Sequence, residues 1–78
     1  MKSNMIENEV CLRIEQILDQ SNQITMEKQL ETMHGIIQVR FLGGSFGLLK
    51  VRYDRIQTTT AAILTFIRAT GYRPQVAG

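Results

Sequence analysis

Residues 36–53 read IIQVRFLGGSFGLLKVRY. Polar and apolar side chains alternate on both sides of the central glycines, which is the pattern of two strands that each bury one face. A glycine pair between two such runs favours a tight turn. This stretch therefore predicts a β-hairpin whose turn lies at residues 43–45.

Two elements are expected before the hairpin. Residues 10–15, VCLRIE, alternate in the same way and predict a first strand. Between that strand and the hairpin, Met26, Leu30 and Met33 recur at helical spacing, and Gly35 suits the turn that ends a helix. The side chains able to cap the start of this helix are Asp19, Ser21 and Asn22.

A second helix is predicted after the hairpin. Thr58 or Thr59 can cap its start, Gly71 ends it, and Pro74 prevents it from resuming. A short final strand is expected at residues 72–76. The resulting order, β-α-β-β-α-β, predicts a ferredoxin-like α/β (α+β) sandwich in which two helices cover one face of a four-stranded antiparallel sheet.

The length and composition fit one small globular domain. The 78 residues are 44% hydrophobic and 21% charged, and they include a single cysteine, which excludes an intrachain disulfide and a thiolate pair. We expect the domain to span residues 9–76 after a flexible start at residues 1–8. Residues 1–10 lack the apolar run of a secretory signal, and no apolar run reaches the roughly 20 residues of a membrane span, so a cytoplasmic location is predicted.

Several short pieces, in order and at matching intervals, resemble the heavy-metal-associated domain family. This family comprises small copper and zinc chaperones and the N-terminal domains of metal-pumping P-type ATPases. The pieces are residues 12–15 in the first strand, Met26-Glu27 with Leu30, Gly35-Ile36 with Val39 and Phe41, Val51 with Tyr53-Asp54, and Ile63 with Ile67 and Gly71-Tyr72. The resemblance implies the ferredoxin-like fold and a role in metal transport.

The chain departs from the family at the loop before the first helix. There the family carries Met-x-Cys-x-x-Cys, whose two thiolates bind one soft metal ion near a helix N-terminus. Counting back from Met26-Glu27 places Ile17, Asp19 and Asn22 at those positions. Carboxylate and amide oxygens suit hard ions such as Mg²⁺ or Mn²⁺, and two of them fall short of the ligands that Ca²⁺ requires.

Two interpretations of Asp19 and Asn22 therefore stay open. They cap the first helix, or they form a weak hard-metal site together with Tyr72, which the family places against the metal loop. No cofactor is assigned, and the copper or zinc cysteine site of the family is absent.

The remaining candidates have simpler interpretations. Cys11 is expected on the open face of the sheet as an ordinary strand residue, and His34 as a cap at the end of the first helix. Met26 and Met33 belong on the apolar helix face, as core residues rather than soft metal ligands. The glycines of residues 43–47 lack the Lys-Ser/Thr ending of a phosphate-binding loop and lead into a strand.

A basic face is the one positive signal for binding. Residues 34–78 carry six basic side chains and one acidic one. Strand parity turns four of the chain's cations to the open sheet face, offset partly by Glu15. The first interpretation is an ordinary solvated face, and the second is a binding face for an acidic protein or domain surface. These four cations are Arg13, Arg40, Lys50 and Arg52. RNA-binding domains of this topology need aromatic residues on that face, so nucleic acid ranks third.

No catalytic set is visible, because no nucleophile lies beside a base and no two carboxylates converge. The leading hypothesis is a non-catalytic domain of a metal-transport system, at the cytoplasmic N-terminus of a P-type metal ATPase, that acts by docking or regulation. The alternative is a metal-independent interaction or oligomerisation module, and nucleic-acid binding through the basic face is third.

Overall fold

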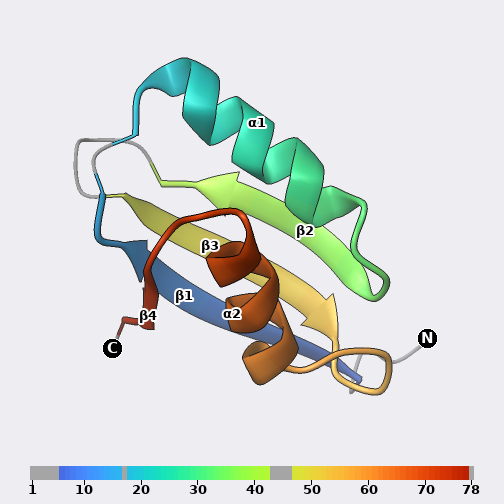
Figure 1. The fold of residues 1–78 in the computed structure, drawn as a ribbon. Helices are drawn as coiled ribbons and strands as arrows, with labels where there is room; N and C mark the ends of the chain where they lie inside the picture. Colours follow the sequence, from blue (N-terminus) through green and yellow to red (C-terminus); the bar gives the residue numbers. More distant parts are fainter. Residues whose placement is uncertain (1–5, 17, 43–46, 78) are drawn as a thin grey trace.

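The computed structural model describes residues 6–16, 18–42 and 47–77. It contains the six predicted elements in the predicted order (Figure 1). They are β1 (Glu7–Ile14), α1 (Gln20–Glu31), β2 (Ile36–Phe41), β3 (Leu48–Asp54), α2 (Thr60–Ala69) and β4 (Pro74–Val76). The predicted hairpin turn at residues 43–45 lies outside the described residues.

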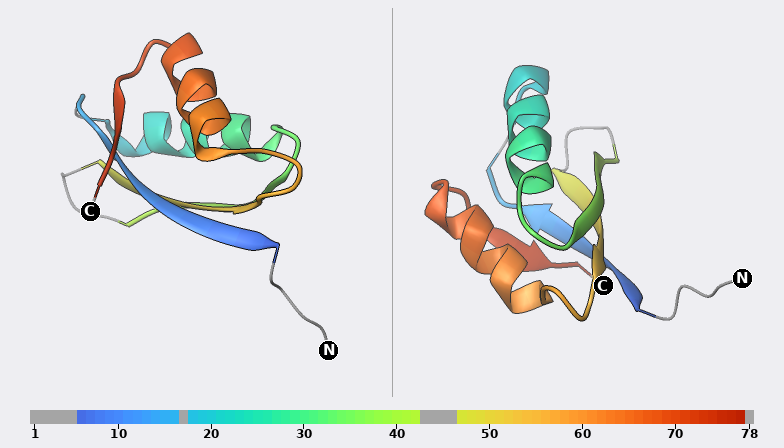
Figure 2. Two further views of the ribbon diagram at one scale, coloured as in Figure 1. Left: turned by 90° about the horizontal axis from the view of Figure 1, so that it is seen from below. Right: turned by 90° about the vertical axis from the view of Figure 1, so that its right-hand side faces the viewer.

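The four strands form one antiparallel sheet in the order β2-β3-β1-β4. Both helices lie on the same side of this sheet, and the other side is open (Figure 2). The ferredoxin-like fold class is therefore confirmed. No helix of the described residues is long and apolar enough to cross a membrane.

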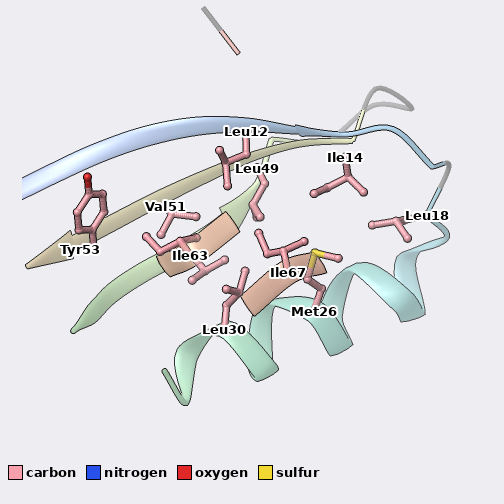
Figure 3. Packing of buried hydrophobic residues seen from close by; sticks show 11 residues of the cluster. Leu12, Ile14, Leu18, Met26, Leu30, Leu49, Val51, Tyr53, Ile63 and Ile67 are labelled. Carbon is pink, nitrogen blue, oxygen red and sulfur yellow. The ribbon is translucent and has the colours of Figure 1, made fainter. Parts of the chain in front are cut away.

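The core lies between the sheet and the two helices (Figure 3). It forms because the alternating residues of β1 and β3 place their apolar side chains on the helix side. Met26 and Leu30 of α1 and Ile63 and Ile67 of α2 cover them, as the helical spacing predicted. The buried residues are Leu12, Ile14, Leu18, Met26, Leu30, Val39, Leu49, Val51, Tyr53, Ile63 and Ile67.

A β-bulge adjusts strand β2 to this core. Ile36 lies opposite Tyr53 and Gln38 lies opposite Arg52, so two steps along β2 match one step along β3. The extra residue, Ile37, is exposed. The bulge explains how the apolar pair Ile36-Ile37 fits a strand that otherwise alternates, because it keeps Ile36 and Val39 on the buried side.

Both helices have N-cap residues that the sequence predicted, whereas the C-terminal end of α1 differs from the prediction. Asp19 and Thr59 cap the two N-termini, as predicted. However, α1 ends at Glu31, and the Thr32 hydroxyl donates a hydrogen bond to the Gln29 carbonyl oxygen (2.6 Å). The prediction that His34 caps this helix is therefore wrong, because His34 lies in the following turn and is exposed.

The first and last strands of the chain differ in length from the prediction. Strand β1 begins at Glu7, two residues before the expected domain start, because Glu7 and Asn8 continue the pairing opposite Asp54 and Tyr53. These polar residues offered no apolar alternation to detect. Strand β4 begins at Pro74 rather than at residue 72.

Candidate functional site

The loop that leads into α1 and the first turn of that helix hold the two residues that the resemblance aligns with the family's cysteine positions. Asp19 Oδ1 accepts a hydrogen bond from the backbone N–H of Asn22 (2.8 Å), and Asp19 has the extended backbone of an N-cap residue. This bond satisfies one of the free N–H groups in the first turn of the helix. Capping therefore accounts for the carboxylate at position 19, and both side chains are exposed.

Gln16 joins this loop to the segment around Tyr72. Its Oε1 accepts a hydrogen bond from the Arg73 N–H (3.0 Å), and its Nε2 donates to the Gly71 carbonyl oxygen (3.4 Å). The Glu15 N–H also donates to the Arg73 carbonyl oxygen (3.0 Å). These bonds place the backbone on either side of Tyr72 against the loop, and Tyr72 itself packs against the core. Sequence reasoning missed Gln16, because a polar residue in a loop carries no spacing signal.

The donor atoms of this loop do not suit a soft metal ion. Asp19, Asn22 and Tyr72 would offer a carboxylate, an amide and a phenol, all of them oxygen or nitrogen donors that Cu⁺ binds poorly. Cys11 lies in β1 opposite Lys50, on the open side of the sheet. Within residues 6–16, 18–42 and 47–77, no three His, Cys, Asp or Glu side chains lie close enough together to hold a metal ion.

Two other acidic residues of the family-like pieces have structural roles. Asp54 accepts hydrogen bonds from the Ile56 N–H (2.9 Å) and from the Gln57 side-chain amide (2.7 Å), which fixes the loop between β3 and α2. Glu27 accepts a hydrogen bond from the Phe41 N–H (2.8 Å), which joins α1 to the edge strand β2. These hydrogen bonds give the acidic residues at positions 27 and 54 a structural role in the fold.

The open sheet face is less basic than the sequence predicted. Arg13, Arg40 and Lys50 are exposed and Arg52 is half-exposed, in line with the predicted parity. However, Glu9 Oε2 lies 4.0 Å from Lys50 Nζ, and Glu7 Oε1 lies 3.7 Å from Arg52 Nε. The prediction counted only Glu15 against the four cations, because it began the first strand at residue 10 and so left Glu7 and Glu9 out of the sheet.

The structure also divides the four cations into two groups. Arg40, Lys50 and Arg52 line a shallow hollow of the open face, whereas Arg13 lies opposite Leu48 and Gln75 and does not line it. The described residues that line this hollow, which we call the β2–β3 hollow, are Glu9, Gln38, Arg40, Leu42, Lys50 and Arg52. The sequence predicted that β2 pairs with β3, and this pairing sets the location of the hollow. The shape of the hollow does not follow from the pairing.

Solved structures with the same arrangement include metal-binding domains. Oxidized MerP from Ralstonia metallidurans CH34 matches with a TM-score of 0.82 at 18% identity, over 92% of this chain and 99% of MerP. A copper binding domain from HMA7, a P-type ATPase, matches with a TM-score of 0.81 at 11% identity, over 90% of this chain and 93% of that domain. The chain has the fold of a heavy-metal-associated domain.

A third match comes from Bacillus subtilis. The copper form of a CopA variant from this organism matches the chain with a TM-score of 0.76 at 25% identity, over 92% of this chain and 93% of that structure. No family model and no curated protein matches the chain. The resemblance to heavy-metal-associated domains is thus confirmed by the fold.

Proposed function

We propose that the chain is a non-catalytic heavy-metal-associated domain that works in a metal-transport system by docking to another protein domain. The setting that fits best is the cytoplasmic N-terminal part of a P-type metal ATPase. The observation that carries the proposal is the combination of this fold with Asp19 at a family cysteine position, where its carboxylate caps α1. A domain of this shape without a thiolate pair retains its docking surfaces and loses the chemistry that carries Cu⁺.

The electrostatics of the loop support this proposal. A helix N-terminus favours a negative charge, and a cysteine pair there is held as thiolates ready for a soft cation. In this chain the same position holds a carboxylate that is bound to the backbone. Capturing an ion with Asp19 would therefore compete with the cap, whose loss typically costs about 1 kcal/mol of stability.

Metal titrations followed by NMR test the loss of soft-metal binding. The wild-type chain is titrated with Cu⁺, Zn²⁺ and Mn²⁺ under reducing conditions, and the amide signals of the loop and of Tyr72 are followed. We expect no saturable change for Cu⁺ or Zn²⁺ at these residues. Saturable Cu⁺ binding at Asp19 and Asn22 would contradict the proposal, and Mn²⁺ broadening confined to Asp19, Asn22 and Tyr72 would instead support the hard-metal alternative.

A double variant provides the matched control. D19C/N22C restores two thiols three residues apart at the start of α1, and it should bind Cu⁺ if the loop retains the family geometry. Because Cys can no longer cap the helix well, the thermal midpoint of this variant is measured first. Binding by the variant and none by the wild type would show that the side chains, and not the backbone, account for the lost function.

The second candidate function is a metal-independent interaction or oligomerisation module. It is favoured by the structural use of Asp19 and Gln16, whose side chains bond to backbone groups of the fold. Cross-linking of the tagged chain in its own cells separates the two functions. Recovery of metal-transport proteins supports the first, and repeated recovery of other proteins, or of the chain alone, supports the second.

A further inference from the structure

The β2–β3 hollow brings three positive charges together at a cost to the sheet. Arg40 of β2 lies directly opposite Lys50 of β3, and Arg52 is the next outward residue along β3. Like charges directly opposite each other in a sheet destabilise it. Among the described lining residues Glu9 alone is acidic, against three cations, so these residues carry an excess of positive charge.

The hydrogen-bonding capacity of these cations is incompletely used within the described part of the chain. Arg52 Nε is buried and has no hydrogen-bond partner among the described residues. Glu7 Oε1 lies 3.7 Å from it, which is beyond hydrogen-bond distance, and Glu9 Oε2 is 4.0 Å from Lys50 Nζ. Both contacts are long ion pairs on a solvent-exposed face, and such pairs contribute little to stability. The neighbouring acidic residues therefore only weakly compensate the cations, and an anion that enters the hollow would meet the Arg40, Lys50 and Arg52 side chains that line it.

We infer that the β2–β3 hollow is a docking site for one carboxylate side chain on an acidic peptide segment of a partner protein. The carboxylate would sit among Arg40, Lys50 and Arg52, where planar guanidinium groups can donate paired hydrogen bonds to its two oxygens. This inference names the partner chemistry for the docking function proposed above, and it rests on that function.

The surroundings of the hollow favour a peptide over a nucleic acid. Glu7 and Glu9 border the cations on the β1 side, so a chain of phosphates that crosses the sheet would meet repulsion beside one favourable contact. The outward positions of β1, β2 and β3 hold no aromatic residue on which a base could stack. Leu42 is 45% exposed and lines the hollow, so the methylene groups of a glutamate side chain would have an apolar contact.

The test uses a synthetic peptide of glutamate and glycine, about eight residues long, which is enough to cross the paired strands. It is blocked at both ends, and the ¹⁵N-labelled chain is titrated with it at low salt. The control peptide has glutamine in place of every glutamate. We expect weak, salt-sensitive shifts at Gln38, Arg40, Leu42, Lys50 and Arg52 with the acidic peptide only. Equal shifts with both peptides, or no shifts at millimolar peptide, would overturn the inference.

Three variants give the matched comparison. R40Q should weaken peptide binding by about threefold to fivefold, whereas R13Q, on the same face but outside the hollow, should change it less than about twofold. E9Q should strengthen binding, because it removes the competing carboxylate. Equal losses in R40Q and R13Q would mean general attraction by the face and overturn the site.

Two further ligands separate the sources of negative charge. Inorganic phosphate and a short RNA are titrated in place of the peptide. Weaker binding of both supports a peptide carboxylate, and tighter binding of either overturns the inference. A failed peptide titration refutes only this site, because the metal titrations and the cross-linking test the proposed function separately.

Discussion

The loop before α1 and the open face of the sheet both carry polar side chains but use them differently. In the loop, Asp19 and Gln16 hydrogen-bond to backbone groups at 2.8 to 3.4 Å. On the open face, Arg40 and Lys50 lie opposite each other, and the buried Arg52 Nε lacks a hydrogen-bond partner in the described part of the chain. The Asp19 and Gln16 side chains are thus occupied with holding the fold, whereas Arg52 Nε, which has no hydrogen-bond partner among the described residues, belongs to the open face of the sheet.

This difference shows why residue type is a poor guide to function in a small domain. An exposed aspartate in a loop is compatible with a ligand or a cap, and only its hydrogen bonds distinguish them. A cation on a strand gains functional meaning when it has no structural partner and adjoins others of the same charge. Four predictions test this contrast, beginning with the largest expected effect.

The first prediction compares two leucines. Leu18 lies in the loop and is only 8% exposed, so Leu18→Ala should lower the free energy of unfolding by about 2 to 3 kcal/mol through lost burial and a cavity. Leu42→Ala on the open face should change it by less than about 0.5 kcal/mol. Urea denaturation measures both. Equal effects would mean that the loop is not anchored to the core.

The second prediction concerns the contact between the end of β1 and the start of β3. Gly47 has φ +65°, and a Cβ atom there would lie 2.7 Å from the Ile14 carbonyl oxygen. Gly47→Ala should therefore cost about 2 kcal/mol from the left-handed backbone and the clash. Gly71→Ala has a similar backbone (φ +97°) but no atom of the described residues within 4 Å, so about 1 kcal/mol is expected. Thermal unfolding of both variants checks which of them loses more stability. The order reverses if the Ile14 carbonyl oxygen does not lie close to Gly47.

The third prediction concerns the two residues at the cysteine positions. Asp19→Ala removes the cap of α1 and should cost about 1 kcal/mol, whereas Asn22→Ala should cost less than about 0.5 kcal/mol, because the bond uses only the Asn22 backbone. Denaturation in metal-free buffer containing a chelator measures the difference. The opposite result would be two variants as stable as the wild type in chelator and less stable than it only when Mn²⁺ is added. In that case the two residues are metal ligands rather than a cap and its neighbour.

The fourth prediction concerns Arg40 and is the smallest effect. Unlike the other three, it is a gain in stability. Arg40→Gln removes one of two like charges that face each other across β2 and β3, so it should raise stability by about 0.3 kcal/mol at low salt. The gain should vanish at about 1 M salt, where the Debye length falls to about 3 Å. Denaturation curves at both salt concentrations test it. A destabilised Arg40→Gln variant would show that this arginine holds the fold, as the loop residues do.

Much of the fold could be predicted because local signals agreed with one another. Alternation indicated β1, β2 and β3, helical spacing indicated α1 and α2, and threonine and aspartate indicated the two caps. The β-bulge at Ile37 and the start of β1 at Glu7 could not be predicted, because both depend on partners in another strand. The end of α1 at Glu31 was missed because Thr32 and His34 are both plausible caps in sequence.

The candidate sites were predicted less completely, for a similar reason. Residue order located the loop at Asp19 and Asn22, and parity located Arg40, Lys50 and Arg52 on the open face. Gln16 became visible only through its bonds to Gly71 and Arg73, which are more than 50 residues away. The acidic residues that offset the basic face were missed, since Glu7 and Glu9 acquire their neighbours only when β1 pairs with β3.

The sequence by itself determined the element order, the buried face of each strand and the absence of a thiolate pair at the family's metal position. These properties are local, because they depend on periodicity and on residue identity along the chain. Only the tertiary structure decided that Asp19 serves as a cap, that Arg13 stands apart from the other cations, and that Arg52 Nε lacks a hydrogen-bond partner within the described residues. The physical reason is that hydrogen-bond partners and charge neighbours come from strands and loops brought together by folding.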